Sequence, residues 1–369
     1  EPEIFTRPEP DPSAIRAAAD LLASAKRPLI WSGGGVNLSD ASRELIEVAE
    51  MLGAPVISTA EGKGSIPESH PLAIGTTSYE WGPGTDLYPQ ADVILAVGSR
   101  LGNYRPEPGT TPTAEQKLVN LNIDETEMGK TMPVAVGVVA DAKVGLKHLG
   151  TALRQRSVQS RWDKSDLART KVTLVERMKS LAPRQVAVVE GIREAIPDDG
   201  FLVGGITNIG AWTYLAYPAL KPRTFIGSSY MGNLGFGFPT ALGVKVGNPD
   251  RAVVALCGDG GFMYAVADLA TAVQYGINLV TVVFNNHGYG ASFRDQHRRF
   301  GDRLVGTELH NPDFVKLAES FGARGIQVPL FEDTPEAIRD AIAGGRPTVI
   351  EVELPAELDP PYYLQPPRE

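Results

Sequence analysis

Cysteine is nearly absent from this chain, and no apolar run approaches the length of a membrane span. The 369 residues include a single cysteine, Cys257. An internal disulfide is therefore excluded, and a reducing compartment such as the cytoplasm is expected. A membrane-spanning helix needs about 18 consecutive apolar residues, and no stretch of the sequence provides them. The sequence predicts a cytoplasmic protein with no membrane partner.

An excess of basic residues is missing as well. The chain has 35 Lys and Arg against 44 Asp and Glu, which gives a net charge of -9. Binding to nucleic acid needs clustered cationic side chains that neutralise phosphates. The basic stretch at 154–164 is interrupted by Asp163 and followed by Asp166, which is typical of a solvated surface. The acidic net charge and the lack of a basic cluster therefore favour a small-molecule partner over a nucleic acid. No internal repeat suggests a solenoid.

Alternating helix and strand signals dominate what is present. Hydrophobic residues make up 43% of the chain, enough for two domains with real cores. In the first half, amphipathic segments separate short apolar runs, a pattern typical of an open α/β domain. The predicted strands are 28–32, 55–58, 92–98, 117–123 and 136–139, and a helix from Ala142 to about Arg154 closes the domain. We predict a Rossmann-like domain over residues 1–155.

A second α/β series follows a polar connection at 156–184, which we expect to be helical only in part. The series predicts helices at 186–196, 208–217 and 262–275, and strands at 201–204, 252–257, 278–284, 324–328 and 347–354. The pairs Asn311–Pro312 and Thr334–Pro335 indicate the starts of two further helices. The second domain is predicted over 185–355, followed by a proline-rich extended arm at 356–369. The fold class is α/β, with two open, mainly parallel sheets.

Two short polar motifs end two of these predicted strands. Asp259 lies in GDGG (258–261), after strand 252–257, and Asn286 ends the NN pair after strand 278–284. In a right-handed βαβ unit the carboxyl ends of both strands meet at one edge, where ligands bind. Carboxylate and amide oxygens suit Mg²⁺ or Ca²⁺ better than zinc. The N–H groups of Gly260 and Gly261, at a helix start, can hold an anion. Either motif alone is a common turn or loop, but together they predict a metal–diphosphate clamp.

The segment from Gly258 to Asn286 also resembles the fingerprint of thiamine-diphosphate-dependent enzymes. Residues 221–251 and 310–328 resemble the segments on either side of that fingerprint in the acetolactate synthase-like group. The first half of the chain is similar to the central domain of the same group over residues 53–75, 91–101 and 122–130. The resemblance covers nearly the whole chain. It implies a central domain followed by a thiamine-diphosphate-binding domain.

The resemblance also implies roles for individual residues. The metal ligands would be the side chains of Asp259 and Asn286 and the carbonyl of Gly288. The diphosphate would lie along Thr207, Asn208, Gly258, Gly260, Gly261, Tyr289 and Gly290. The carbonyl of Gly232 would accept a hydrogen bond from the pyrimidine amino group, and Leu234 would separate the two cofactor rings. An ordinary core leucine is the alternative for Leu234.

Enzymes of this group begin with a pyrimidine-binding domain that supplies a catalytic glutamate, and we expect this chain to lack it. The chain alone is therefore expected to be inactive. It would be a trimmed enzyme, one subunit of a split enzyme, or a natural non-catalytic binder. Because cofactor sites in the group lie between subunits, and a lone diphosphate domain would expose apolar surface, a homodimer or homotetramer is expected.

The reaction itself is left open by the sequence. The resemblance implies a 2-oxo acid substrate such as pyruvate, which loses CO₂ and is then protonated by a decarboxylase or joined to a second carbonyl compound by a carboligase. The alternatives are an acyl-CoA-type decarboxylase and a non-catalytic nucleotide- or diphosphate-binding module. Acetolactate synthases tend to carry a tryptophan after the asparagine pair. None lies between Asn286 and Asp302, which counts against strict acetolactate synthase activity.

Two further features have both a ligand-binding and a structural interpretation. The triplet Gly33–Gly34–Gly35 follows a predicted strand. FAD or ADP could lie close to its backbone, although the triplet does not match GxGxxG. A loop without a ligand is the alternative. In the segment after Asn286, the side chains of His287, Arg294 and His297 are candidates for substrate contact or proton transfer. An ordinary surface loop is the alternative there.

Overall fold

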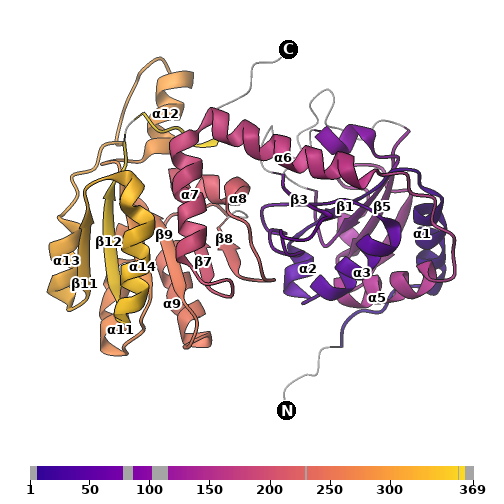
Figure 1. The fold of residues 1–369 in the computed structure, drawn as a ribbon, viewed down its shortest axis with the longest axis horizontal. Helices are drawn as coiled ribbons and strands as arrows, with labels where there is room; N and C mark the ends of the chain where they lie inside the picture. Colours follow the sequence, from indigo (N-terminus) through magenta and orange to yellow (C-terminus); the bar gives the residue numbers. More distant parts are fainter. Residues whose placement is uncertain (1–5, 78–85, 102–114, 229–230, 356, 362–369) are drawn as a thin grey trace. The chain divides into compact units, whose positions relative to one another are not determined.

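The protein forms two compact units, each built on one sheet. The computed structural model describes residues 6–77, 86–101, 115–228, 231–355 and 357–361. The first unit comprises residues 1–177 and 218–223, and the second comprises 178–217 and 224–369. Each unit holds a six-stranded sheet (Figure 1) whose strand pairs are all parallel. The predicted α/β class with two parallel sheets is confirmed.

The strand order of the first sheet reverses between β1 and β4. Its strands are β1 Pro28–Ser32, β2 Val56–Ser58, β3 Ala73–Thr76, β4 Val93–Val97, β5 Lys117–Asn122 and β6 Val136–Val139. They are ordered β3-β2-β1-β4-β5-β6. This is the order of a classical dinucleotide-binding sheet, in which ligands occupy the crevice at the reversal. The Rossmann-like description of this half therefore holds for its topology.

The helices of the first unit are α1 Pro12–Ser24, α2 Gly34–Leu38, α3 Ser42–Leu52 and α5 Ala142–Leu153, with 3₁₀ turns η1 Tyr88–Gln90 and η2 Glu125–Glu127. Of these, the longer helices α1, α3 and α5 each bury one apolar stripe, whereas the short α2 buries only Val36. The polar connection contains a longer helix, α6 Lys164–Leu181. Leu167 and Leu174, two turns apart on α6, join the core of the first unit, so this helix has a packed apolar face.

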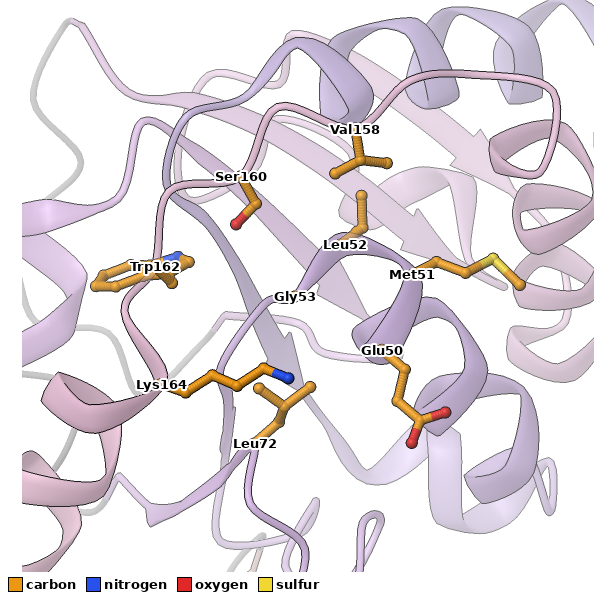
Figure 2. Close-up of a pocket in the computed structure, with 9 residues that line it drawn as sticks. All are labelled: Glu50, Met51, Leu52, Gly53, Leu72, Val158, Ser160, Trp162 and Lys164. Carbon is orange, nitrogen blue, oxygen red and sulfur yellow. The ribbon is translucent and has the colours of Figure 1, made fainter.

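A surface hollow of about 280 Å³ lies in the first unit (Figure 2). Helix α3 ends beside it at Gly53, whose φ of 55° is the left-handed conformation that ends many helices. Trp162 is held by a hydrogen bond of 2.7 Å from its indole N–H to the Pro28 carbonyl. The lining residues are Glu50, Met51, Leu52, Gly53, Leu72, Val158, Ser160, Trp162 and Lys164. None of the residues predicted to bind a ligand is among them.

The strand order of the second sheet reverses between β7 and β9. Its strands are β7 Phe201–Gly204, β8 Phe225–Gly227, β9 Val253–Gly258, β10 Val280–Asn285, β11 Arg324–Val328 and β12 Thr348–Glu353. They are ordered β11-β12-β10-β9-β7-β8. The helices are α7 Pro183–Ala195, α8 Asn208–Ala216, α9 Gly237–Gly247, α10 Asp259–Met263, α11 Leu269–Gln274, α12 Gly290–Arg299, α13 Phe314–Phe321 and α14 Thr334–Gly344, with 3₁₀ turns η3 Val266–Asp268 and η4 Phe331–Asp333.

The second sheet is buried on both faces, as its continuous apolar strands predict. Val253, Ala255 and Cys257 alternate along β9 and enter a core shared with α9, α11 and α13. The intervening residues Val254 and Leu256 are equally buried. Helices α7 and α14 contact each other and lie together over the sheet in Figure 1. Among the described residues, no helix is both long and apolar enough to span a bilayer.

Two helix predictions were wrong, and both errors fall near the motifs at 258–286. The single helix predicted at 262–275 is divided into separate segments. Helix α10 begins earlier, at Asp259, and the helical conformation is interrupted at Ala265, where φ is -130°. Asn311 does not start a helix. Helix α13 is instead capped by Asp313, whose carboxylate accepts from the Lys316 N–H at 2.9 Å. An acceptor at this position satisfies a free N–H group of the first turn. The side chain of Asn311 is thus available for other contacts.

Candidate functional site

The predicted site lies where the strand order of the second sheet reverses. The ends of β7 and β9 approach closely there, with glycine at the contact. A Cβ atom on Gly205 would lie 2.8 Å from the Leu256 carbonyl oxygen, and one on Gly258 would lie 3.2 Å from that of Ile206. A side chain at Gly205 would clash at this approach, and in sheets of this kind ligands bind at the carboxyl edge where the strand order reverses.

Three helices begin at this edge without a side-chain cap. They are α8, α10 and α12. The side chains of the N-cap residues Thr207 and Tyr289 accept no hydrogen bond from the first turn, and the N-cap Gly258 has no side chain. The first N–H groups of a helix lack intrahelical partners and carry partial positive charge, so they favour an anion. Gly260 and Gly261 belong to one of these first turns and Gly290 to another. The structure thus brings most of the predicted diphosphate residues to helix starts.

Asp259 is a buried carboxylate with two donors on one oxygen. Its side chain is 1% exposed. Oδ2 accepts from the Gly288 N–H at 3.0 Å and from Nδ2 of Asn311 at 2.7 Å. These two bonds stabilise the charge in a buried position. The other oxygen, Oδ1, is directed at the side chain of Asn286.

The three predicted metal ligands converge in the structure. One terminal atom of the Asn286 carboxamide lies 3.1 Å from Asp259 Oδ1 and 3.1 Å from the Gly288 carbonyl oxygen. With the amide nitrogen at this position, Asn286 would donate to both oxygens; with the amide oxygen there, three acceptors face one another. Three converging oxygens are a donor set for a hard cation. Among the described residues there is no cluster of three His, Cys, Asp or Glu side chains, so this site has one carboxylate and two neutral oxygens.

The sequence interpretation missed three residues behind Asp259. Asn285 donates from Nδ2 to Oε1 of Glu351 at 2.8 Å and accepts at Oδ1 from Nδ2 of Asn311 at 2.9 Å. Asn285 was visible as the first member of the asparagine pair. Asn311 was mistaken for a helix cap, although Asp313 two residues later is an equally good one.

Tyr289, Leu234 and Gly232 were predicted to contact the cofactor. A Cβ atom on Gly260 would lie 2.6 Å from the ring of Tyr289, so that ring packs directly over α10. Burial, together with the hydroxyl of Tyr264 and the charge of Asp259, raises the pKa of Tyr289 above its ordinary value. Cδ2 of Leu234 lies 3.7 Å from the corresponding Cβ position on Gly261. These side chains therefore adjoin the first turn of α10.

Gly232 lies apart from these contacts. It is exposed and has φ 59°, and its N–H donates to the Ser228 carbonyl at 2.8 Å. Nothing lies within 4 Å of the position that its Cβ atom would occupy. Its predicted role toward the pyrimidine ring stays a prediction.

Other polar candidates have partners within the protein. Nδ2 of Asn208 donates to the Leu358 carbonyl at 2.6 Å, and Arg294 pairs with Asp359 at 3.0 Å. Among the histidines of the candidate substrate loop, His287 pairs with Glu353 at 3.1 Å, and His297 contacts Asp302. Leu358 and Asp359 belong to the predicted arm, of which residues 356 and 362–369 lie outside the described residues.

The glycine triplet of the first unit has a structural explanation. A Cβ atom on Gly33 would lie 2.3 Å from the Gly98 carbonyl oxygen, and one on Gly35 would lie 2.7 Å from Gly98 Cα. Close packing against Gly98 therefore requires Gly33 and Gly35, whether or not a ligand binds there. FAD binding stays a prediction. In the second unit, burial raises the pKa of the Cys257 thiol to about 12, which gives it no reactive character at neutral pH.

Comparison with known families agrees with this geometry. Residues 205–352 match the model of the thiamine pyrophosphate enzyme C-terminal TPP-binding domain. Residues 15–149 match the model of the thiamine pyrophosphate enzyme central domain. The chain belongs to the thiamine pyrophosphate enzymes, for which thiamine diphosphate is the cofactor. The strand ends that carry Asp259 and Asn286 lie within the matched TPP-binding domain.

Individual relatives cover most of this chain. It is 32% identical over 362 residues to a probable acetolactate synthase large subunit of Methanococcus aeolicus, which covers 93% of this chain and 60% of that protein. It is 32% identical over 402 residues to a sulfoacetaldehyde acetyltransferase of Castellaniella defragrans, covering 98% and 66%. A putative thiamine pyrophosphate-containing protein, YdaP, of Bacillus subtilis is 29% identical over 358 residues, covering 94% and 60%. The chain thus spans 60% to 66% of the length of these curated relatives.

Proposed function

We propose that this chain forms the diphosphate- and metal-binding half of an acetolactate synthase-like enzyme that depends on thiamine diphosphate and Mg²⁺ and acts on a 2-oxo acid such as pyruvate. The observation that carries the proposal is the convergence of Asp259 Oδ1, the Asn286 carboxamide and the Gly288 carbonyl beside three helix starts without side-chain caps. A cation and an anionic diphosphate satisfy both features at once.

The donor set suits Mg²⁺ bound together with a diphosphate. Mg²⁺ prefers oxygen ligands and usually keeps water and phosphate oxygens in part of its coordination shell. Asp259 supplies the single negative charge, while Asn286 and Gly288 supply neutral oxygens. The remaining ligands would come from the diphosphate and water. The protein therefore binds the metal fully only when the cofactor is present.

The diphosphate would be held by backbone donors and by the side chains of Thr207, Tyr289 and Asn208. The N–H groups of Gly260, Gly261 and Gly290 belong to first turns, and Thr207 is the N-cap of α8. The Gly290 N–H donates to the Gly288 carbonyl at 3.0 Å, so its proposed contact with the diphosphate requires that this bond be exchanged. The phenol of Tyr289 is a hydrogen-bond donor near neutral pH, and the raised pKa of Tyr289 extends this range to higher pH. Asn208 donates to Leu358 here, and its proposed contact with the diphosphate requires that this bond be exchanged.

The bound cofactor supplies an electron sink for cleavage of the bond between the keto and carboxyl carbons of the substrate. This chain contributes placement: Leu234 beside Gly261 would orient the rings, and Gly232 would accept from the pyrimidine amino group. Its buried carboxylate and fixed dipoles would act most strongly once the site is covered and water is excluded. The names of the relatives include a synthase and an acetyltransferase, which favours a carboligase over a simple decarboxylase.

Exposed apolar side chains surround the proposed site. Segments that follow the carboxyl ends of β7, β8, β9 and β10 carry Ile206, Met231, Met263, Tyr264, Phe293, Phe300, Leu304 and Val305. An apolar surface of this kind is expected to be covered by another protein surface. We propose that a pyrimidine-binding domain covers it, from the same gene product or a partner subunit, within a homodimer or homotetramer. That domain would supply the catalytic glutamate, so this chain alone is expected to be inactive.

The test uses the protein at the length its cell produces, beside the 369-residue chain, with the native mass determined first. Calorimetry measures binding of thiamine diphosphate with and without Mg²⁺, and assays follow CO₂ release from pyruvate and from acyl-CoA esters. Mg²⁺-dependent binding with pyruvate turnover supports the proposal, and turnover of CoA esters alone favours an acyl-CoA-type decarboxylase. Binding without turnover at native length indicates a non-catalytic module, and absence of binding overturns the proposal. A purified protein without flavin absorbance would exclude bound FAD.

A further inference from the structure

A chain of hydrogen bonds runs from the interior of the second sheet to Asp259. Glu351 on β12 accepts from Nδ2 of Asn285 at 2.8 Å. Oδ1 of Asn285 accepts from Nδ2 of Asn311 at 2.9 Å, and the same nitrogen donates to Asp259 Oδ2 at 2.7 Å. Glu351 and Asn285 are 7% and 2% exposed. Two buried carboxylates are thus joined through two amides, and only one of these carboxylates faces the proposed cation site.

The two carboxylates determine which way both amides point. An ionised carboxylate only accepts hydrogen bonds, so Asn285 must present its nitrogen to Glu351 and its oxygen to the opposite side. That oxygen also accepts from the His287 N–H at 3.1 Å. Asn311 must then present its nitrogen to both Asn285 and Asp259. Reversing either amide would place acceptor against acceptor in a buried position, which is unfavourable.

The consequence falls on the two oxygens of Asp259. Oδ2 receives both the Asn311 amide and the Gly288 N–H, so its accepting capacity is used. Oδ1 contacts only the carboxamide of Asn286, which also contacts the Gly288 carbonyl and can present either its nitrogen or its oxygen there. We propose that Asn311, oriented by Glu351 through Asn285, is a positioning residue that makes Asp259 a one-oxygen ligand. This inference rests on the proposed function, since it assigns the cation to Oδ1.

One-oxygen ligation bears on the choice of metal. Mg²⁺ demands near-octahedral geometry, whereas Ca²⁺ accepts irregular coordination and carboxylates that bind through both oxygens. Without Asn311 the carboxylate of Asp259 can turn and offer both oxygens. Loss of Asn311 should therefore weaken Mg²⁺ binding more than Ca²⁺ binding. A residue that merely supports the fold would weaken both alike.

The test compares Asn311→Leu and Asn311→Asp with the wild-type protein at native length. Mg²⁺ and Ca²⁺ are titrated calorimetrically at a fixed concentration of thiamine diphosphate, and thermal unfolding is followed without ligands. We expect Asn311→Leu to bind Mg²⁺ about 10- to 100-fold more weakly, the usual loss for a partner behind a metal ligand. Asn311→Asp should lose more, because it places a second carboxylate against Asp259. Glu351→Gln should lose less, since a glutamine can satisfy Asn285 in either orientation.

Asp313→Ala is the matched control. It removes the cap of α13 two residues from Asn311, so it should lower the unfolding temperature without changing the ratio of Mg²⁺ to Ca²⁺ affinity. If wild-type protein takes up no thiamine diphosphate with Mg²⁺, the proposed function fails. If it does, and Asn311→Leu keeps the wild-type ratio, the inference is overturned while the function stands. If circular dichroism shows that Asn311→Leu does not fold, the ratio of Mg²⁺ to Ca²⁺ affinity in Asn311→Asp decides in the same way.

Discussion

The two sheets reverse their strand order in the same manner but differ in the residues that lie at the carboxyl edge at each reversal. In the first unit the reversal between β1 and β4 is filled by backbone: the N–H of Gly35 donates to the Gly98 carbonyl at 2.9 Å, with Gly33 packed against the same loop. In the second unit the reversal between β7 and β9 is lined by acceptor oxygens and by helix starts without side-chain caps. Strand order creates the position of a site, but the residues at the strand ends decide whether a ligand is needed there.

Two buried aspartates show the same contrast. Asp141, in the first unit, accepts from Arg7, from Ser39 and from two N–H groups of α5. Burial acts to raise the pKa of Asp141, but these donors together hold it below its ordinary value. Both oxygens of Asp141 thus have protein donors. Asp259 has protein donors from two other segments on Oδ2, whereas Oδ1 meets only the carboxamide of Asn286, whose oxygen would turn toward a bound cation.

The largest effect is expected from Asp259→Ala. Removing the only carboxylate of the proposed metal site should weaken Mg²⁺-dependent binding of thiamine diphosphate by more than about 100-fold, beyond the usual cost of losing a partner behind a ligand. Calorimetry on the native-length protein measures this affinity. Asp250→Ala, an exposed site in the same unit, serves as the control. Affinity retained in Asp259→Ala would refute the proposed metal site.

Gly98→Ala should strongly destabilise the first unit. Its φ is 58° and its new Cβ atom would lie 2.6 Å from Gly35 Cα, so the free energy of unfolding should fall by about 3 kcal/mol. Gly129→Ala adds a Cβ atom at φ 75° with nothing within 4 Å, and should cost only about 1 kcal/mol of backbone strain. Urea unfolding compares the two. Equal losses would show that close packing at Gly98 is not the reason for glycine.

Asp141→Ala should have the smallest effect and a defined pH dependence. Loss of the α5 cap should lower the free energy of unfolding by about 1 kcal/mol at pH 7. Because the folded pKa of Asp141 is depressed, its ionic contribution is complete above the ordinary value of 3.8 and is lost as the pH falls through the lower folded value. The difference from wild type should therefore narrow below pH 3.8. Urea unfolding at several pH values measures it, and a constant difference would contradict the assignment.

Much of the candidate site was predictable because its signals are local. Asp259 and Asn286 each follow an apolar strand, and parallel strands joined by a crossover must end at one edge. Asn311 was not predictable in this way. An Asn–Pro pair is a common helix start, and the choice between Asn311 and Asp313 as the cap depends on where the chain turns toward the sheet. The division of the predicted helix 262–275 was also not predictable from local signals. It depends on how the chain leaves the sheet, since α10 begins directly at the end of β9.

The sequence by itself determined the strands other than β3 and β8, their parallel arrangement and the polar groups at their ends, because hydrophobic period and motif position are properties of neighbouring residues. Only the tertiary structure decided which oxygen of Asp259 faces the proposed cation. That choice depends on donors from Gly288 and Asn311, and on Glu351 behind Asn285. These residues come from separate segments that the folded sheet brings within hydrogen-bonding distance.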